Sequence, residues 1–279
     1  MTEPALQQEQ HDHIFVSWSQ LRAHDECKQK AYLYRQRRRS PGQDIRMFFP
    51  GTVVDRIMRE WLDNEAREPG MHLRVSEVMD REETTARESG DGIVRWKNQS
   101  DRREVHDTCV ELLARLEPIL TKLVLPHEFE PAKRFRVPLT VPGPHDQPVT
   151  VTLNGEMDLL VRENGADWCV YDLKATRNED YWRKTIMQLV FYDLAVRAGF
   201  GSYSKRLALI QPLCKQPIVV IEASDDLRRQ LVQRIIAMVH DRVREDFSPK
   251  PDEAGCSWCD VRHACLKFKP VNGRMSLLA

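Results

Sequence analysis

Apolar residues recur at helical spacing through the first half of the chain. Residues 17–36 form a helical run that Ser17 or Ser19 caps. Residues 70–126 are charged and helical in pattern, with their apolar positions on one side. The clearest run, residues 52–67, follows a Pro-Gly pair and carries apolar residues three and four apart: Val53, Val54, Ile57, Met58 and Trp61. The pattern therefore predicts a helical part over residues 15–130, after a polar tail at 1–14 that we expect to be disordered.

The pattern changes near residue 133 to short stretches rich in β-branched residues and separated by Gly, Pro and Asn. Residues 134–142, 148–164 and 167–176 are predicted to be three consecutive, mostly antiparallel strands. A helix is expected from about 180 to 198, then strands at 205–213 and 216–223, then an amphipathic helix at 224–247 capped by Ser224 or Asp225.

These elements predict an α/β fold, a mixed sheet flanked by helices, with helical additions at its N-terminal end. Residues 15–279 are expected to form one domain. Its parts are a helical portion at 15–130, a sheet and helix at 131–223, and a helix with a cysteine-rich tail at 224–268.

Composition and charge narrow the function classes only slightly. The 42 basic and 42 acidic residues give a formal net charge of zero, so composition alone does not indicate a nucleic-acid-binding protein. No stretch reaches the apolar length of a membrane-spanning helix, and we expect a cytoplasmic protein. In that compartment clustered cysteines are more often metal ligands than disulfides.

Cys256, Cys259 and Cys265 form a C-x2-C-x5-C motif near the end of the chain. Three thiolates this close suit a tetrahedral metal site or an iron–sulfur cluster, and either needs a fourth ligand. Cys27 is the best candidate for that ligand, and His263 is a less favoured one. Such a site would join the N-terminal helix to the C-terminal tail. The spacing equally permits a structural Zn2+. The remaining cysteines lie in apolar contexts typical of core residues: Cys109, Cys169 and Cys214.

A second set of candidate residues lies in the middle of the chain. Asp172 and Lys174 are two apart on one predicted strand, so their side chains share a face. Asp158 reaches the same face if its strand pairs with theirs. Converging carboxylates repel one another unless a divalent cation lies between them, and such a cation can activate water for phosphodiester cleavage. On the following helix, Gln188 and Tyr192 are four apart and share one face, where they could orient a phosphate or a base.

The order of these residues resembles the RecB-like branch of the PD-(D/E)XK nucleases, and within it the members with a 4Fe–4S cluster, such as CRISPR-associated exonucleases and AddB-type nuclease domains. The opening segment, residues 17–34, is similar to that family as well. The resemblance covers about residues 15–268 and implies a restriction-endonuclease-like fold.

By position, the resemblance implies that Asp158 and Asp172 bind Mg2+ or Mn2+ and that Lys174 assists the attacking water. It implies that Gln188 and Tyr192 contact DNA or order the site. The four ligands of the cluster would be Cys27, Cys256, Cys259 and Cys265. One position departs from the family, which has a metal-binding histidine in a G-x3-H pattern where this chain has Asp55.

The expected function is a metal-dependent DNA exonuclease acting on single-stranded ends, with the cluster as a structural staple. Helicase, recombination or CRISPR-adaptation partners would fit, and no membrane partner is expected. The basic run at residues 35–39 is either a solvated turn or a contact for the DNA backbone. Two alternatives remain open: a non-catalytic DNA-binding or assembly module of the same fold, which the aspartate at position 55 favours, and a zinc-stapled binding protein unrelated to nucleases.

Overall fold

A computed structural model describes residues 14–36, 44–89, 93–125, 127–163, 165, 167–250, 253–257, 259–265, 267–271 and 274–277. Most of the basic run at 35–39 lies outside these residues, as does most of the expected N-terminal tail. Residue 14, which the sequence assigned to that tail, instead begins a strand.

Within the described residues the centre of the fold is a mixed, six-stranded sheet with the order β1-β3-β4-β5-β6, in which β2 also pairs with β3. The β2–β3, β3–β4 and β5–β6 pairs are antiparallel, whereas β1–β3 and β4–β5 are parallel. The strands are β1 (Ile14–Val16), β2 (Glu128–Pro142), β3 (Pro148–Glu163), β4 (Asp167–Leu173), β5 (Arg206–Ile210) and β6 (Ile218–Ile221). The expected α/β class and the three consecutive antiparallel strands are confirmed.

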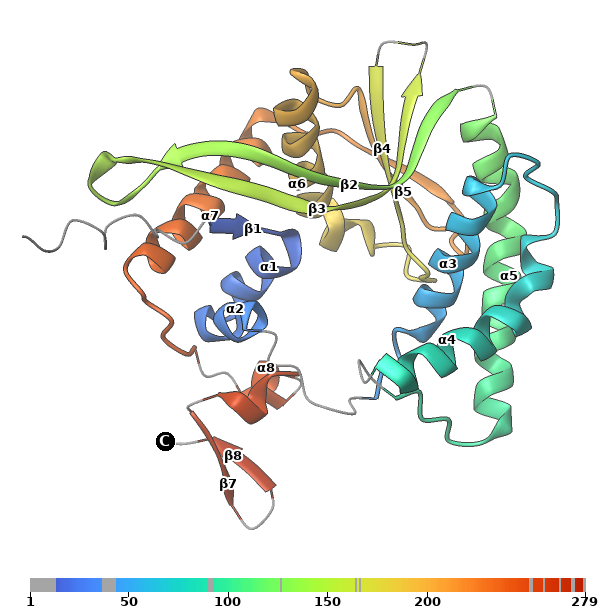
Figure 1. Cartoon of the computed structure of the whole chain (residues 1–279), viewed down its shortest axis with the longest axis horizontal. Coiled ribbons are helices and arrows are strands. Elements are labelled where there is room, and N and C mark those ends of the chain that lie inside the picture. Colours follow the sequence, from blue (N-terminus) through green and yellow to red (C-terminus); the bar gives the residue numbers. More distant parts are fainter. Residues whose placement is uncertain are drawn as a thin grey trace, which may run out of the picture.

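Helices cover both faces of the sheet (Figure 1). One hydrophobic core joins α3 (Phe49–Asp63), α4 (Val75–Ser89) and α5 (Gln99–Val124) to one face of β3 and β4. A second core joins α1 (Trp18–Glu26), α6 (Trp182–Phe200) and α7 (Asp225–Val243) to the other face. Alternation along β3 produces the two cores, because Leu159 belongs to the first and Leu160 to the second.

The predicted N-terminal helical run is divided in two. Ser17 caps α1 through a capping box with Gln20, as expected for a Ser followed three residues later by Gln. Cys27 then has an extended backbone, with φ −167° and ψ 122°, and a second helix, α2 (Lys28–Arg35), begins after it. The cysteine therefore lies at a junction between helices rather than on a helix face. Ser224 caps α7.

Short elements complete the chain. They are the 3-10 helices η1 (Met71–Arg74), η2 (Pro144–Asp146) and η3 (Arg262–Ala264), the helix α8 (Glu253–Ser257), and the hairpin of β7 (Phe268–Val271) and β8 (Arg274–Leu277). In Figure 1 α8 lies beside α2, so the first and last parts of the chain meet.

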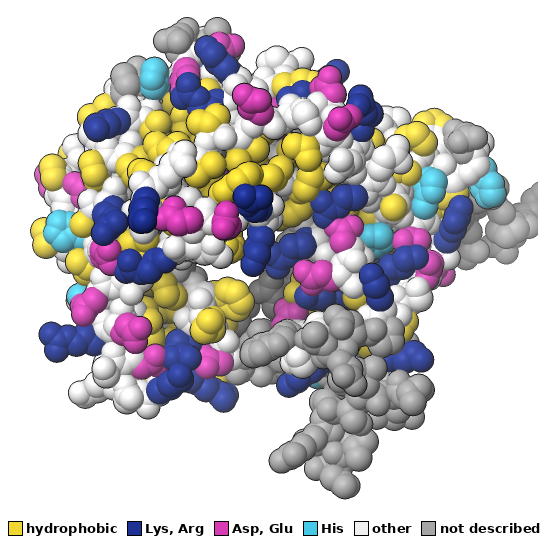
Figure 2. Space-filling model, turned by 180° about the vertical axis from the view of Figure 1, so that it is seen from behind, with side chains coloured by type: hydrophobic (Ala, Val, Ile, Leu, Met, Phe, Trp, Pro, Cys, Tyr) yellow, Lys and Arg dark blue, Asp and Glu magenta, His cyan; other side chains and the backbone are white. Residues whose placement is uncertain are grey.

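The surface is evenly charged on the face that Figure 2 displays, where Lys and Arg side chains alternate with Asp and Glu around a central hydrophobic area. This agrees with the net charge of zero. None of the helices in the described part of the chain is both long and apolar enough to cross a membrane.

Candidate active site

Asp172 and Lys174 meet at the end of β4, between β3 and β5. Asp172 is fully buried, and its Oδ2 lies 2.6 Å from the Nζ of Lys174. The backbone N–H of Lys174 donates to the carbonyl of Ile210 at 2.8 Å, which extends the β4–β5 ladder and fixes the lysine.

The electrostatics of this pair keep the lysine charged. Burial raises the pKa of Asp172, and the ammonium of Lys174 only partly opposes this. Burial lowers the pKa of Lys174, but the charges of Asp172 and Asp158 outweigh it and the net pKa is raised. Lys174 is therefore a fixed cation at neutral pH rather than a proton acceptor.

Asp158 on β3 reaches the same place, as the sequence predicted. The β3–β4 ladder pairs Leu159 with Tyr171, and Asp158 lies one residue beyond. Its Oδ2 accepts a hydrogen bond of 2.7 Å from the backbone N–H of Leu173. Burial, and then repulsion by the Asp172 carboxylate, raise the pKa of Asp158 to about 7. The two carboxylates thus destabilise one another's charged form.

Gln188 and Tyr192 on α6 complete the arrangement. The Nε2 of Gln188 donates to Asp172 Oδ1 at 3.2 Å and to the Tyr192 hydroxyl at 2.8 Å. Burial raises the pKa of Tyr192, so it remains a neutral phenol. The ring of Phe135 on β2 contacts that of Tyr192 edge-on, with centroids 6.1 Å apart. The predicted helix face therefore points at the buried carboxylate.

Asp55 on α3 lies at the edge of the same site, where its charge contributes to the raised pKa of Asp158. Its Oδ2 is 2.8 Å from the Nε of Arg59, one helical turn later. The Arg59 guanidinium also forms an ion pair with Glu156 on β3. The sequence analysis did not single out Arg59 or Glu156. The available signals were the i,i+4 spacing of Asp55 and Arg59 and the two-residue spacing of Glu156 and Asp158.

The donor set fits a hard divalent cation. Asp158 and Asp172 offer carboxylate oxygens, the ligands that Mg2+ prefers, and their mutual repulsion is what a cation between them would relieve. Across the described residues, no three acidic, histidine or cysteine side chains are grouped as a ready metal site. Asp55 in particular faces Arg59 rather than joining Asp158 and Asp172.

The four candidate cysteines lie where the C-terminal tail meets α2. The Sγ of Cys265 donates to Gln29 Oε1 at 3.5 Å, and the Tyr34 hydroxyl donates to the Asp260 carboxylate at 2.8 Å. The Sγ of Cys27 accepts from the backbone N–H of Lys250 at 3.4 Å. All four are of intermediate exposure and form no disulfide within the described residues: Cys27, Cys256, Cys259 and Cys265. The remaining three cysteines are buried, as predicted: Cys109, Cys169 and Cys214.

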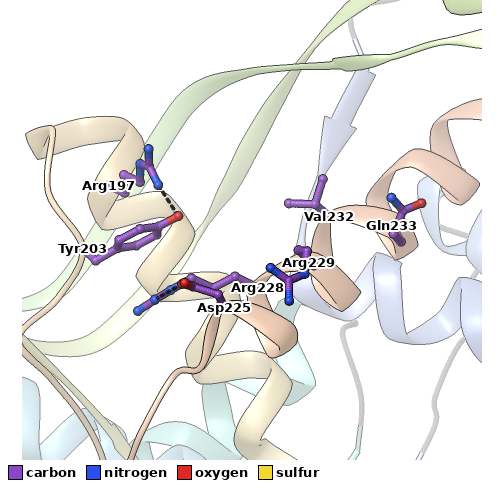
Figure 3. Close-up of a pocket in the computed structure, with 7 residues that line it drawn as sticks. All are labelled: Arg197, Tyr203, Asp225, Arg228, Arg229, Val232 and Gln233. Atoms are coloured by element: carbon purple, nitrogen blue, oxygen red, sulfur yellow. Dashed lines mark hydrogen bonds and ion pairs between the residues drawn. The ribbon is translucent and has the colours of Figure 1, made fainter.

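Cavities also lie away from the carboxylates. One of about 490 Å3 lies between the end of α6 and α7, and Figure 3 shows Arg197, Tyr203 and Arg228 converging there. Arg228 Nε is 2.9 Å from the buried carboxylate of Asp193, so this cluster fastens the two helices together. Another cavity, of about 740 Å3, has Cys27 in its wall.

Comparison with known proteins agrees with this geometry. Residues 16–266 match the family model of the PD-(D/E)XK nuclease superfamily. The chain belongs to the PD-(D/E)XK nuclease superfamily. Membership indicates a nuclease that acts on DNA, and PD-(D/E)XK nucleases usually use Mg2+ or Mn2+.

Other comparisons add little to the superfamily match. No curated protein matches the chain. A solved structure described as "Crystal structure of SSO0001" is similar, with 14% identity, a TM-score of 0.36, and coverage of 77% of this chain and 95% of that chain. A likeness of this size supports no conclusion about activity.

Proposed function

We propose that this PD-(D/E)XK protein is a metal-dependent DNA exonuclease of the RecB-like branch that acts on single-stranded ends. The observation that carries the proposal is the convergence of Asp158 and Asp172 beside the ammonium of Lys174, with Gln188 hydrogen-bonded to Asp172. The end-directed activity is supported by the motif order that resembles this branch, including the Ser17-capped helix followed by Cys27.

Asp158 and Asp172 would hold the cation. Asp55, at the edge of the site, would be a third carboxylate ligand if it were released from Arg59. A bound Mg2+ or Mn2+ would supply a Lewis acid that lowers the pKa of water and stabilises charge on the phosphate. Lys174, held in its charged form by its neighbours, adds positive charge where the phosphate accumulates negative charge. Gln188 orients the Asp172 carboxylate and ties it to the Tyr192 hydroxyl.

The test is degradation of end-labelled single-stranded and duplex DNA with Mg2+ or Mn2+, by the wild type and by Asp172→Asn. Circular single-stranded DNA is the second substrate, because it has no end for an exonuclease. We expect metal-dependent loss of label from linear strands, with circles intact and the variant inactive. Equal cleavage by Asp172→Asn would overturn the site. Cleavage of circles would show an endonuclease instead.

We further propose that Cys27, Cys256, Cys259 and Cys265 hold a 4Fe–4S cluster that staples the tail to the N-terminal helices. The contact of Cys265 with Gln29 and that of Cys27 with Lys250 support this, because each joins the C-terminal tail to the first two helices. The four thiols are not yet grouped in the described part of the chain, so the cluster would draw them together. Cys256→Ala, in protein purified without oxygen, should lose iron and visible absorbance. Cys214→Ala, which removes a buried thiol outside the group, should retain both. Zinc in place of iron in the wild type would identify a structural Zn2+ site.

A non-catalytic DNA-binding or assembly module remains the second candidate. The observation that favours it is the engagement of Asp55 by Arg59, which leaves two rather than three carboxylates facing the site. This alternative predicts salt-dependent binding to DNA ends without cleavage in either metal.

A further inference from the structure

Arg59 pairs with two carboxylates that come from different elements. Asp55 precedes it by one turn on α3, with Nε to Oδ2 at 2.8 Å. Glu156 lies on β3 and binds the other side of the guanidinium. Arg59 and Glu156 are each 27% exposed, so the bridge is partly shielded from water. It therefore ties α3 to the strand that carries Asp158.

Glu156 is also held by a second arginine, which lies on β2. The Nε of Arg134 on β2 lies 2.9 Å from the second oxygen of Glu156. Glu156 is thus held between two guanidinium groups, and the position of Arg59 follows from it. By contrast, Arg56 on the same helix pairs with Glu82 of α4 at 3.0 Å and contacts no residue of the site. Arg56 supplies a matched control.

Asp55 lies near Asp158, because Arg59 links it to Glu156, which is two residues from Asp158 on β3. A cation held by Asp158 and Asp172 would attract Asp55. A guanidinium already bound to Asp55 opposes this, because it occupies one carboxylate oxygen and neutralises the charge that would attract the cation.

We propose that Arg59 is a positioning residue that restrains Asp55 through the bridge to Glu156 and thereby weakens divalent cation binding in the DNA-free protein. This inference rests on the proposed function, because it takes the aspartate site to be the metal site. A DNA phosphate can offer the guanidinium an alternative partner, which would release Asp55 to the metal. Metal and DNA would then bind cooperatively through Arg59.

The experiment is a calorimetric titration of the DNA-free full chain with Mn2+. Arg59→Gln should bind Mn2+ about three- to fivefold more tightly than the wild type, the range expected on removing a partly exposed charge. Arg56→Gln should bind like the wild type. In the Asp55→Asn background, Arg59→Gln should produce no gain, because the residue it acts through is no longer a carboxylate.

Each outcome bears on a different claim. Unchanged or weaker Mn2+ binding by Arg59→Gln would overturn the inference, and so would a gain that persists in Asp55→Asn. Binding that is unaffected by Asp158→Asn would instead show that the proposed metal site is wrong. If Arg59→Gln does not fold, Arg59→Lys replaces it. Lysine keeps the charge but lacks the planar fork of the guanidinium, so it should hold Asp55 and Glu156 less firmly, and a gain of about twofold is expected.

Discussion

The Nζ of Lys174 lies 2.6 Å from the carboxylate of Asp172, which is fully buried. Neither charge would be stable alone at this depth, because burial disfavours the charged form of both. Each charge therefore stabilises the other, and the ammonium of Lys174 is in place beside the carboxylates before any substrate or metal binds.

Replacing Lys174 tests the role of that charge. Lys174→Ala should reduce the rate of DNA cleavage by about 100-fold or more, the usual effect of removing a group that stabilises transition-state charge. The measurement is single-turnover cleavage in Mg2+, with folding checked by circular dichroism. Lys205→Ala removes an exposed lysine paired with Asp167 at the start of β4 and should cleave at the wild-type rate. Equal rates for Lys174→Ala and Lys205→Ala would contradict the assignment.

The raised pKa of Asp158 predicts how stability depends on pH in metal-free protein. A carboxyl with a pKa of about 7 when folded and near 3.8 when unfolded binds its proton more tightly in the native state. The free energy of unfolding should therefore fall as pH rises from about 4 to 7, with the full penalty present above pH 7.

Asp158→Asn should remove this pH dependence. Because the side chain is partly open to solvent, we expect the variant to be more stable than the wild type by about 1–2 kcal/mol at pH 8 and about equally stable at pH 4. Urea unfolding with a chelator present measures both values. Asp226→Asn, an exposed residue, is the control and should show no such pH-dependent difference. A stability gain at pH 4 as large as at pH 8 would argue against the pKa shift.

Asp193 is buried and should contribute to stability rather than activity. Its Oδ1 accepts from the backbone N–H of Ser204 at 2.8 Å, and its Oδ2 lies 2.9 Å from Arg228. Asp193→Ala leaves the Ser204 N–H without its acceptor and Arg228 with only its exposed partner, and should lower the free energy of unfolding by about 2–4 kcal/mol. Asp225→Ala, which removes only the exposed partner of Arg228, should change it by less than about 1 kcal/mol. Denaturant unfolding of the two variants compares the contributions directly.

Gly155 on β3 lies close to the ring of Phe135, which contacts Tyr192 of the site. It lies opposite Phe135 in the β2–β3 pair, and a Cβ there would be 2.8 Å from the ring. Gly155→Ala should push that ring toward Tyr192 and destabilise the protein by about 1–3 kcal/mol. Adding Phe135→Leu should restore part of the loss, as thermal unfolding would show. A fully stable single variant would mean that the ring has room to move.

Local pattern was enough to predict much of the fold. The β-branched residues of 148–164, between turns marked by Gly, Pro and Asn, predicted β3. The Ser-Asp start of residues 224–247 predicted the cap of α7. Asp158 and Asp172 could be placed on one face because side-chain alternation is fixed within a strand and the turn between the strands is short.

Features that depend on distant partners could not be predicted. Strand β1 is only three residues long and is a strand because β3 pairs with it, a contact with no local signal. The start of β2 at Glu128 was missed because Pro131 and Ala132 interrupt its β-branched pattern. Likewise, the bridge from Arg59 to Glu156 joins residues almost a hundred positions apart, and only the sheet places them side by side.

The meeting of the chain's two ends has a consequence for how the protein is made. His24 and Lys28 pair with Asp241, across separations of 217 and 213 residues. Synthesis runs from the N-terminus, so α1 and α2 leave the ribosome long before Asp241 does. Until then Leu21 and Ala31, buried in the finished protein, have no completed core to cover them. Contacts that close so long a loop form more slowly than local ones, so the packing of α1 and α2 waits for α7.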